Sequence, residues 1–198
     1  MTQSKLLQFA EVCLGSYYSE FKQALDDSKN EEMNTSEFLE KYPMFKMVWA
    51  ELKEIQQGGD DSEIDDCLAV MFLLFAEDKN VMFRVDWSGE DETGDVAQFV
   101  GQLLQSRNIT GFEWDTEKFD ASLDWKQLGR GDYILLLFKA VDKELQKIGN
   151  RLTFFFMGDD SYPFTVLNEA DFDKVNRLAW SYYGVYGANT MNEYQGGM

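Results

Sequence analysis

The ionisable side chains limit the chemistry that this chain can perform. It contains 36 Asp and Glu residues, 18 Lys and Arg residues, and no histidine. Histidine is the usual general base behind a Ser or Cys nucleophile and the commonest zinc ligand, so catalytic triads, Cys-His dyads and His-based metal sites are excluded within this chain. Its two cysteines, Cys13 and Cys67, are too far apart in sequence for a zinc knuckle or a C-x-x-C redox pair. The chemistry that remains is that of carboxylates.

Two adjacent carboxylates, Asp159 and Asp160, stand between the apolar runs 151–157 and 162–167, and Asp86 ends an earlier predicted strand. Paired carboxylates on a turn, completed by a third on a neighbouring strand, are suitable ligands for Mg²⁺ or Ca²⁺. Asp and Ser are also ordinary turn-forming residues, so a hairpin without a metal explains the same sequence. We therefore expect no cofactor, and keep a metal site at these three aspartates as the alternative.

Acidic residues are concentrated in residues 54–95. This stretch contains thirteen acidic residues and only two basic ones, Lys79 and Arg84. It therefore carries −11 of the chain's net charge of −18. Three interpretations remain open: a solvated surface with acids at a helix start, a docking surface for a basic partner, or a cation site. EF-hand spacing fails from both possible starting aspartates, because position 6 is not glycine in either register.

Aromatic residues adjoin several of the acids. Trp87, Trp114 and Trp125 each follow an acidic residue. A ring beside carboxylates suits a Lys or Arg side chain through cation–π and ionic contacts, although core packing is the competing explanation. We predict that a basic protein partner contacts the following residues: Asp60, Asp61, Glu63, Asp86, Trp87, Glu90, Asp91, Glu92 and Trp125. Nucleic acid is not an expected partner, because its phosphates require Lys and Arg.

The elements that position these residues follow from hydrophobic periodicity. Helical spacing covers 5–27, 34–55 with a break at Pro43, 62–75, 96–104, 132–148 and a last helix from Asn168. Alternation predicts strands at 81–87 and 109–114, and a hairpin formed by the two apolar runs around residues 158–161. Asn34 with Glu37, and Ser62 with Asp65, have the spacing of capping boxes.

This order predicts an α+β fold. We expect a mixed or antiparallel sheet of about four strands, with helices mainly on one face and a helical N-terminal segment before it. The expected domains are a helical segment over 1–59 packed on the main domain, an α+β domain over 60–183, and a partly flexible tail over 184–198.

Three short motifs resemble those of a family of bacterial domains of unknown function. They are Val85-Asp86-Trp87, Leu123-Asp124-Trp125 and the hairpin Met157-Gly158-Asp159-Asp160-Ser161-Tyr162-Pro163-Phe164. The family is marked by Asp-Trp strand ends and a Gly-x-Asp-Ser-Tyr-x-Phe hairpin, and the resemblance covers residues 80–183. It implies a related fold and carries no activity.

The composition and the exclusions favour a non-enzymatic interaction protein, of the immunity or inhibitor type, that binds a basic partner. A carboxylate-based divalent-metal-binding protein or enzyme is the alternative. No signal peptide and no run of about 18 apolar residues is present, so no membrane contact is expected. Two free thiols fit a reducing compartment, and we expect a cytoplasmic protein.

Overall fold

The computed structural model describes residues 2–30, 33–86, 94–129, 131–157, 161–180 and 183–190. The chain divides into two compact units. The first, here called the helical unit, comprises Met1–Met82 and Ala179–Tyr183; the second, the sheet unit, comprises Phe83–Leu178 and Gly184–Met198. Within the described residues, no helix combines the length and the apolar composition needed to cross a bilayer.

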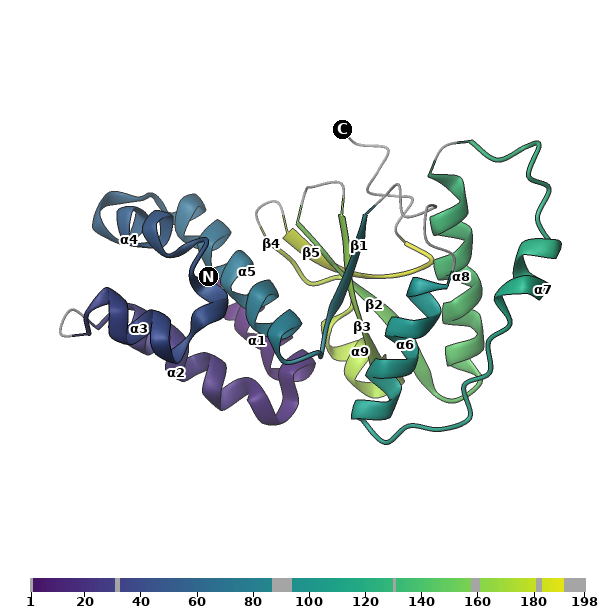
Figure 1. The fold of residues 1–198 in the computed structure, drawn as a ribbon, viewed down its shortest axis with the longest axis horizontal. Coiled ribbons are helices and arrows are strands. Elements are labelled where there is room, and N and C mark those ends of the chain that lie inside the picture. Colours follow the sequence, from purple (N-terminus) through teal and green to yellow (C-terminus); the bar gives the residue numbers. More distant parts are fainter. Residues whose placement is uncertain are drawn as a thin grey trace. The chain divides into compact units, whose positions relative to one another are not determined.

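The helical unit contains short helices joined by tight turns (Figure 1). Its elements are α1 (Thr2–Leu14), η1 (Gly15–Tyr17), α2 (Tyr18–Ser28), α3 (Thr35–Lys41), η2 (Pro43–Phe45), α4 (Trp49–Gly58), α5 (Asp61–Asp78) and the short strand β4 (Ala179–Trp180). The helix expected over 5–27 is interrupted at Gly15, whose φ of 54° lies in the left-handed region that glycine tolerates. The break expected at Pro43 is confirmed, because this proline begins η2.

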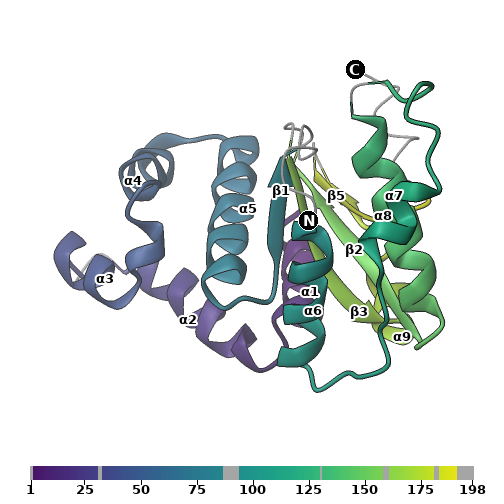
Figure 2. The ribbon, with the colours of Figure 1, turned by 45° about the vertical axis from the view of Figure 1, so that its right-hand side comes forward.

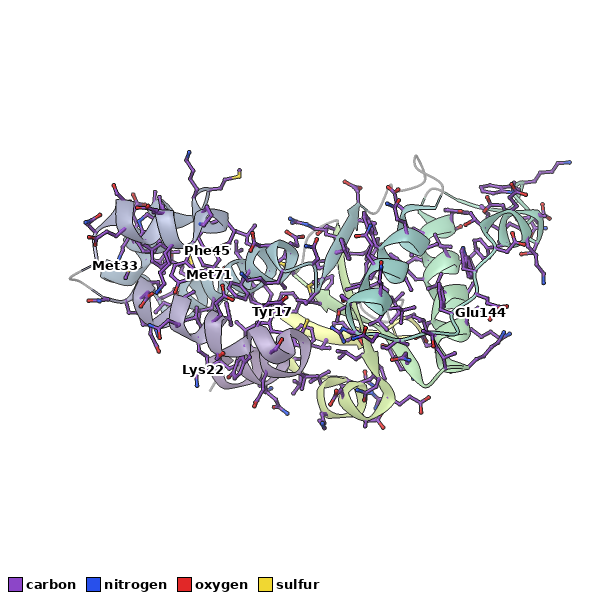
Figure 3. The ribbon with its side chains drawn as sticks, turned by 60° about the horizontal axis from the view of Figure 1, so that its bottom comes forward. Tyr17, Lys22, Met33, Phe45, Met71 and Glu144 are labelled. Atoms are coloured by element: carbon purple, nitrogen blue, oxygen red, sulfur yellow. The ribbon has the colours of Figure 1, made fainter. Side chains whose placement is uncertain are left out.

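Aromatic packing joins α5 to the N-terminal helices. The ring of Phe72 lies 5.3 Å from that of Phe9 and 6.0 Å from that of Phe21, measured between centroids. η2, which carries Phe45, also packs against α5, which carries Met71 (Figure 3). The boundary between the compact units therefore falls between residues 82 and 83 rather than between 59 and 60, because α5 supplies part of the helical core.

Two helix starts show capping boxes. At α3 the Asn34 side chain accepts from the Glu37 N–H and the Glu37 carboxylate accepts from the Asn34 N–H, as expected. At α5 the same reciprocal pair is formed by Asp60 and Glu63, at 2.9 and 3.0 Å. The helix therefore begins at Asp61, before the Ser62 that was expected to cap it, and the Ser62 side chain lies outside the described residues.

A buried acid holds α2 and α3 together. The Asp27 carboxylate accepts hydrogen bonds from Lys41 Nζ at 2.7 Å, Gln23 Nε2 at 2.7 Å and the Tyr42 hydroxyl at 2.9 Å. Burial alone would raise the pKa of Asp27, but the bonds from Lys41, Gln23 and Tyr42 outweigh it and lower the pKa. The carboxylate is therefore fully occupied in a structural role.

The sheet unit confirms the predicted α+β fold (Figure 2). Its elements are β1 (Phe83–Asp86), α6 (Asp95–Ser106), α7 (Thr116–Ala121), α8 (Asp132–Gln146), β2 (Asn150–Phe156), β3 (Ser161–Asn168), α9 (Glu169–Val175) and β5 (Tyr183–Gly187), whose first residue belongs to the helical unit. The strands of this unit lie in the order β1-β3-β2-β5, and every pair is antiparallel. The expected hairpin is β2 with β3.

One face of the sheet carries the main core of this unit. Leu152 and Phe154 of β2, with Phe164 and Val166 of β3, pack against buried side chains of α6 and α8. On the opposite face, the Arg151 guanidinium lies 4.5 Å from the ring centre of Phe172 in α9. The expectation of helices mainly on one face is confirmed.

A buried ion pair connects α8 to β2. Asp142, 1% exposed, accepts from Nε and Nη2 of Arg151 at 3.2 and 3.1 Å and from the Leu152 N–H at 2.8 Å. Gln146 Nε2 adds a fourth bond at 2.8 Å. Because all of these donors converge on one carboxylate, the helix and the strand are fixed in register.

The strand expected over 109–114 is wrong. Residues 109–114 run extended but join no strand, and Gly111 turns the chain at a φ of 91°. The tail expected to be partly flexible over 184–198 begins with a strand, because residues 184–187 belong to β5 and Val185 and Tyr186 pair with Phe155 and Phe154. Residues 191–198 lie outside the described residues.

Candidate functional site

A row of aromatic side chains lies where α7 meets α8. Ring centroids are 5.4 Å apart for Trp114 and Phe119, 5.9 Å for Phe119 and Tyr133, and 5.3 Å for Tyr133 and Trp125. We call these four side chains the aromatic row. Short α7 positions Phe119, because Asp115 accepts a hydrogen bond from the Lys118 N–H and so caps the helix.

Asp120 fixes the outer end of the aromatic row. Its carboxylate accepts from the Tyr133 hydroxyl at 2.9 Å, and its main-chain oxygen accepts from Trp125 Nε1 at 3.1 Å. The two rings stack at an interplanar angle of 22°. Burial, and after it the hydrogen bond to Asp120, raises the pKa of Tyr133 to about 12. Trp125 is 55% exposed even so, and therefore presents a pre-oriented ring to solvent.

The segment that carries Trp125 is acidic. Residues 113–132 contain six acids and three bases, a net charge of −3. Glu113 and Glu117 are exposed, and Asp124 accepts from Gln127 Nε2 at 2.8 Å. An exposed tryptophan face amid negative charge has the chemistry to bind an ammonium or guanidinium group.

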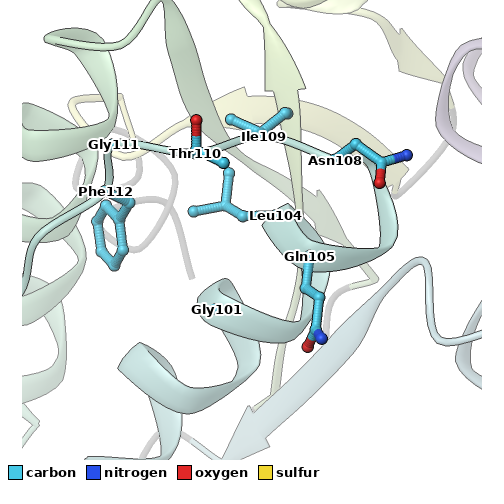
Figure 4. Close-up of a pocket in the computed structure, with 8 residues that line it drawn as sticks. All are labelled: Gly101, Leu104, Gln105, Asn108, Ile109, Thr110, Gly111 and Phe112. Carbon is cyan, nitrogen blue, oxygen red and sulfur yellow. The ribbon is translucent and has the colours of Figure 1, made fainter.

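A shallow hollow opens beside the start of this segment, between α6 and the chain that follows it (Figure 4). Its volume is about 340 Å³. Its lining is uncharged: Gly101, Leu104, Gln105, Asn108, Ile109, Thr110, Gly111 and Phe112. Leu104 points from α6 toward the chain opposite, and the Phe112 ring lies beside it, whereas the amides of Gln105 and Asn108 point away.

The predicted partner-binding residues fall on both units. Asp60, Asp61 and Glu63 stand at the start of α5 in the helical unit, where Asp60 and Glu63 are engaged in capping. Asp86 ends β1 and is exposed, and Trp125 belongs to the aromatic row. The remaining predicted positions, Trp87, Glu90, Asp91 and Glu92, lie outside the described residues.

The predicted metal ligands are only partly described. Asp86 is the cross-strand partner of Ser161, which directly follows the predicted ligands Asp159 and Asp160. The topology thus brings the end of β1 next to the hairpin loop. Asp159 and Asp160 themselves lie outside the described residues. Among the residues that are described, no group of three or more His, Cys, Asp or Glu side chains is arranged to hold a metal ion.

Neither thiol has the surroundings of a nucleophile. Cys13 is buried and Cys67 is partly buried, and both are free. Burial, and after it the charges of Glu51, Asp66 and Glu63, raises the pKa of Cys67 to about 11. The thiol therefore stays protonated at neutral pH, as expected for a packing residue.

The sequence led to Trp125 as a predicted partner-binding residue but not to the groups that hold its ring. Tyr133 stands in the first turn of α8 next to a predicted core face, and Asp120 lies in the unpredicted helix α7. The sequence did contain a signal for α7. Asp115 is a favoured N-cap residue and stands directly before Thr116, which begins the helix.

Comparison with known proteins places the chain in a family. The family model of a domain of unknown function, DUF6630, matches residues 6–181. No curated protein and no solved structure matches the chain. The match extends well beyond the 80–183 region of the short motifs and takes in the N-terminal helices. The chain therefore belongs to the DUF6630 family of domains of unknown function.

Proposed function

We propose that this protein is a non-enzymatic interaction protein, of the immunity or inhibitor type, that binds a basic protein partner through Trp125 and the acids around it. The observation that carries this proposal is the exposed indole of Trp125, held by stacking on Tyr133 and by a hydrogen bond to Asp120. A ring that is already oriented loses little conformational entropy when it binds a cation. Two free thiols support a reducing, cytoplasmic location.

The surrounding charge supports the same partner chemistry. Acids outnumber bases by three over residues 113–132, and the whole chain carries −18. A negative field of this kind speeds association with positive partners and repels negative ones. Exposed aromatic and arginine anchors supply most of the affinity at protein interfaces, so Trp125 is the residue to test.

A hexa-arginine peptide tests the proposal. Its binding is measured by calorimetry against the full chain and against Trp125→Ala, which we expect to weaken binding about tenfold through loss of the cation–π contact. Met47→Ala is the matched control, because Met47 is an exposed apolar residue (93%) in the helical unit. Equal affinity of both variants for the peptide would refute the role of Trp125, and affinity that does not change with salt would refute the role of the acids.

A divalent-metal function is the second candidate, supported by the pairing of Asp86 with Ser161 beside the hairpin loop. Carboxylates at Asp86, Asp159 and Asp160 would hold Mg²⁺ or Ca²⁺ through oxygen ligands. Calorimetry with Mg²⁺, Mn²⁺ and Ca²⁺ tests this candidate, and we expect Asp86→Asn to abolish any binding. Absence of binding at millimolar concentrations would remove the candidate.

A further inference from the structure

The segment 112–114 follows the turn at Gly111 and belongs to no ladder. Within the described residues, no main-chain N–H or C=O from Thr110 to Trp114 forms a hydrogen bond with another protein group. Figures 1 and 2 show the chain passing as an extended trace from the turn after α6 to α7. Main-chain groups in this state are free to pair with an added strand.

The side chains of this stretch alternate as they do in a strand. Phe112 and Trp114 are partly buried against the core of the sheet unit, whereas Glu113 and Asp115 are exposed. Alternation of this kind gives a strand one apolar and one acidic face. The same alternation was the reason to expect a strand over 109–114, which Gly111 interrupts and which has no neighbouring strand.

The hollow lies at the beginning of this stretch. Phe112 lines it together with Leu104, and Trp114, the first ring of the aromatic row, follows two residues later. Two residues of extended chain span about 7 Å. A strand laid along residues 112–115 therefore passes from the uncharged hollow to the aromatic row.

We propose that segment 112–115 is a β-strand addition site for an extended segment of the partner in which aliphatic and basic residues alternate. This inference rests on the proposed function and specifies how the partner binds. Its aliphatic side chains lie on the face of Phe112 and Trp114, with one of them in the hollow, because cross-strand neighbours share a face. Its Lys or Arg side chains face Glu113 and Asp115.

Charge selects this occupant over a second copy of the chain. Residues 110–117 contain three acids and no base. Pairing two copies of the segment would place Glu113 and Asp115 opposite like charges, which destabilises a strand pair. A basic strand instead places opposite charges across the pair.

The test uses the peptide acetyl-Val-Lys-Val-Lys-Val-Lys-Val-amide and a control peptide in which the same residues are grouped as four valines and three lysines. Amide hydrogen exchange of the full chain is followed with each peptide. We expect the alternating peptide to slow exchange at least about tenfold at every second position of 112–114, because only alternate N–H groups of a strand face a single added neighbour. The grouped peptide should have no such effect.

Gly101→Leu tests the hollow. A side chain there meets open space, and leucine is a better helix former than glycine, so the variant keeps its fold. We expect it to weaken the alternating peptide about tenfold and to leave hexa-arginine binding unchanged. Gly101→Ala is the control, because one methyl group leaves most of the hollow open.

The outcomes separate the two proposals. If hexa-arginine binding depends on Trp125 while residues 112–114 gain no protection from the alternating peptide, strand addition is wrong and the proposed function stands. If Gly101→Leu binds the alternating peptide as tightly as the unmodified chain, the hollow does not hold a side chain of the peptide and that part of the proposal is wrong. If neither peptide binds at low salt, both proposals fail.

Discussion

Asp120 organises the candidate surface with two different oxygen atoms. Its carboxylate fixes the Tyr133 hydroxyl, and its carbonyl fixes the Trp125 indole. Asp120 thus fixes the orientation of the Trp125 ring that the partner would contact, although the partner does not need to contact Asp120 itself. Each such bond contributes about 1 kcal/mol.

The Tyr133 phenol gives this arrangement a pH dependence. Its pKa of about 12 in the folded chain exceeds the ordinary value of 10.0. The stabilisation by the neutral phenol is therefore complete below pH 10 and is lost as the pH rises toward 12. We expect Tyr133→Phe to lower the free energy of unfolding by about 1 kcal/mol at neutral pH, and this difference to shrink in alkali.

Urea unfolding at neutral and alkaline pH measures this effect. Tyr17→Phe is the control, because the Tyr17 side chain is 39% exposed. A difference between Tyr133→Phe and the unmodified chain that stayed constant with pH would contradict the argument.

At the scale of elements, the Asp142 carboxylate determines how α8 sits on β2. Removing it leaves the Arg151 guanidinium and the Leu152 N–H without their acceptor in a region closed to water. We expect Asp142→Ala to lower the free energy of unfolding by about 3–5 kcal/mol, measured by urea denaturation.

Glu144→Ala supplies the comparison on the same helix. Glu144 pairs with Lys147 at the surface, so its loss should cost about 0–1 kcal/mol (Figure 3). If both variants lowered the free energy of unfolding equally, burial of the Asp142–Arg151 pair would not increase its contribution to stability.

The sequence predicted elements whose signals are local. The β2–β3 hairpin, the Asn34 cap and the break at Pro43 each depend on residues within a few positions of one another, and all three are confirmed. At α5 two overlapping cap patterns were available, and local spacing does not choose between Asp60 and Ser62.

Elements that depend on a distant partner were missed or misassigned. β5 exists because Val185 and Tyr186 meet β2 about 30 residues earlier in the chain, and residues 109–114 lack such a neighbour despite strand-like alternation. For the same reason Trp125 was identified from its own neighbours, whereas its contact with Tyr133 required the fold.

At the scale of the whole molecule, the charge of −18 lowers the stability of the fold through repulsion and raises the affinity for a basic partner through attraction. Salt screens repulsion among the acids and equally screens attraction to a basic peptide. Raising NaCl from about 20 mM to about 500 mM should therefore raise Tm and weaken hexa-arginine binding.

Trp125→Ala separates these two effects. We expect this variant to show the same rise in Tm, because it keeps every charge, while its affinity for the peptide is already low. A Tm that fell with salt would show that attraction between charges, and not repulsion, dominates the folded state.

The division of the chain into two units also determines when the helical unit can complete its fold during synthesis on the ribosome. Residues 1–82 emerge first, yet Ala179, which accepts a hydrogen bond from Lys5, and Tyr183, whose hydroxyl binds Asp66, follow about 100 residues later. At bacterial or eukaryotic translation speeds this interval is about 5–20 s. For that time the N-terminal helices must persist without their last strand, so a nascent chain paused near residue 82 is where we expect chaperone contact to be greatest.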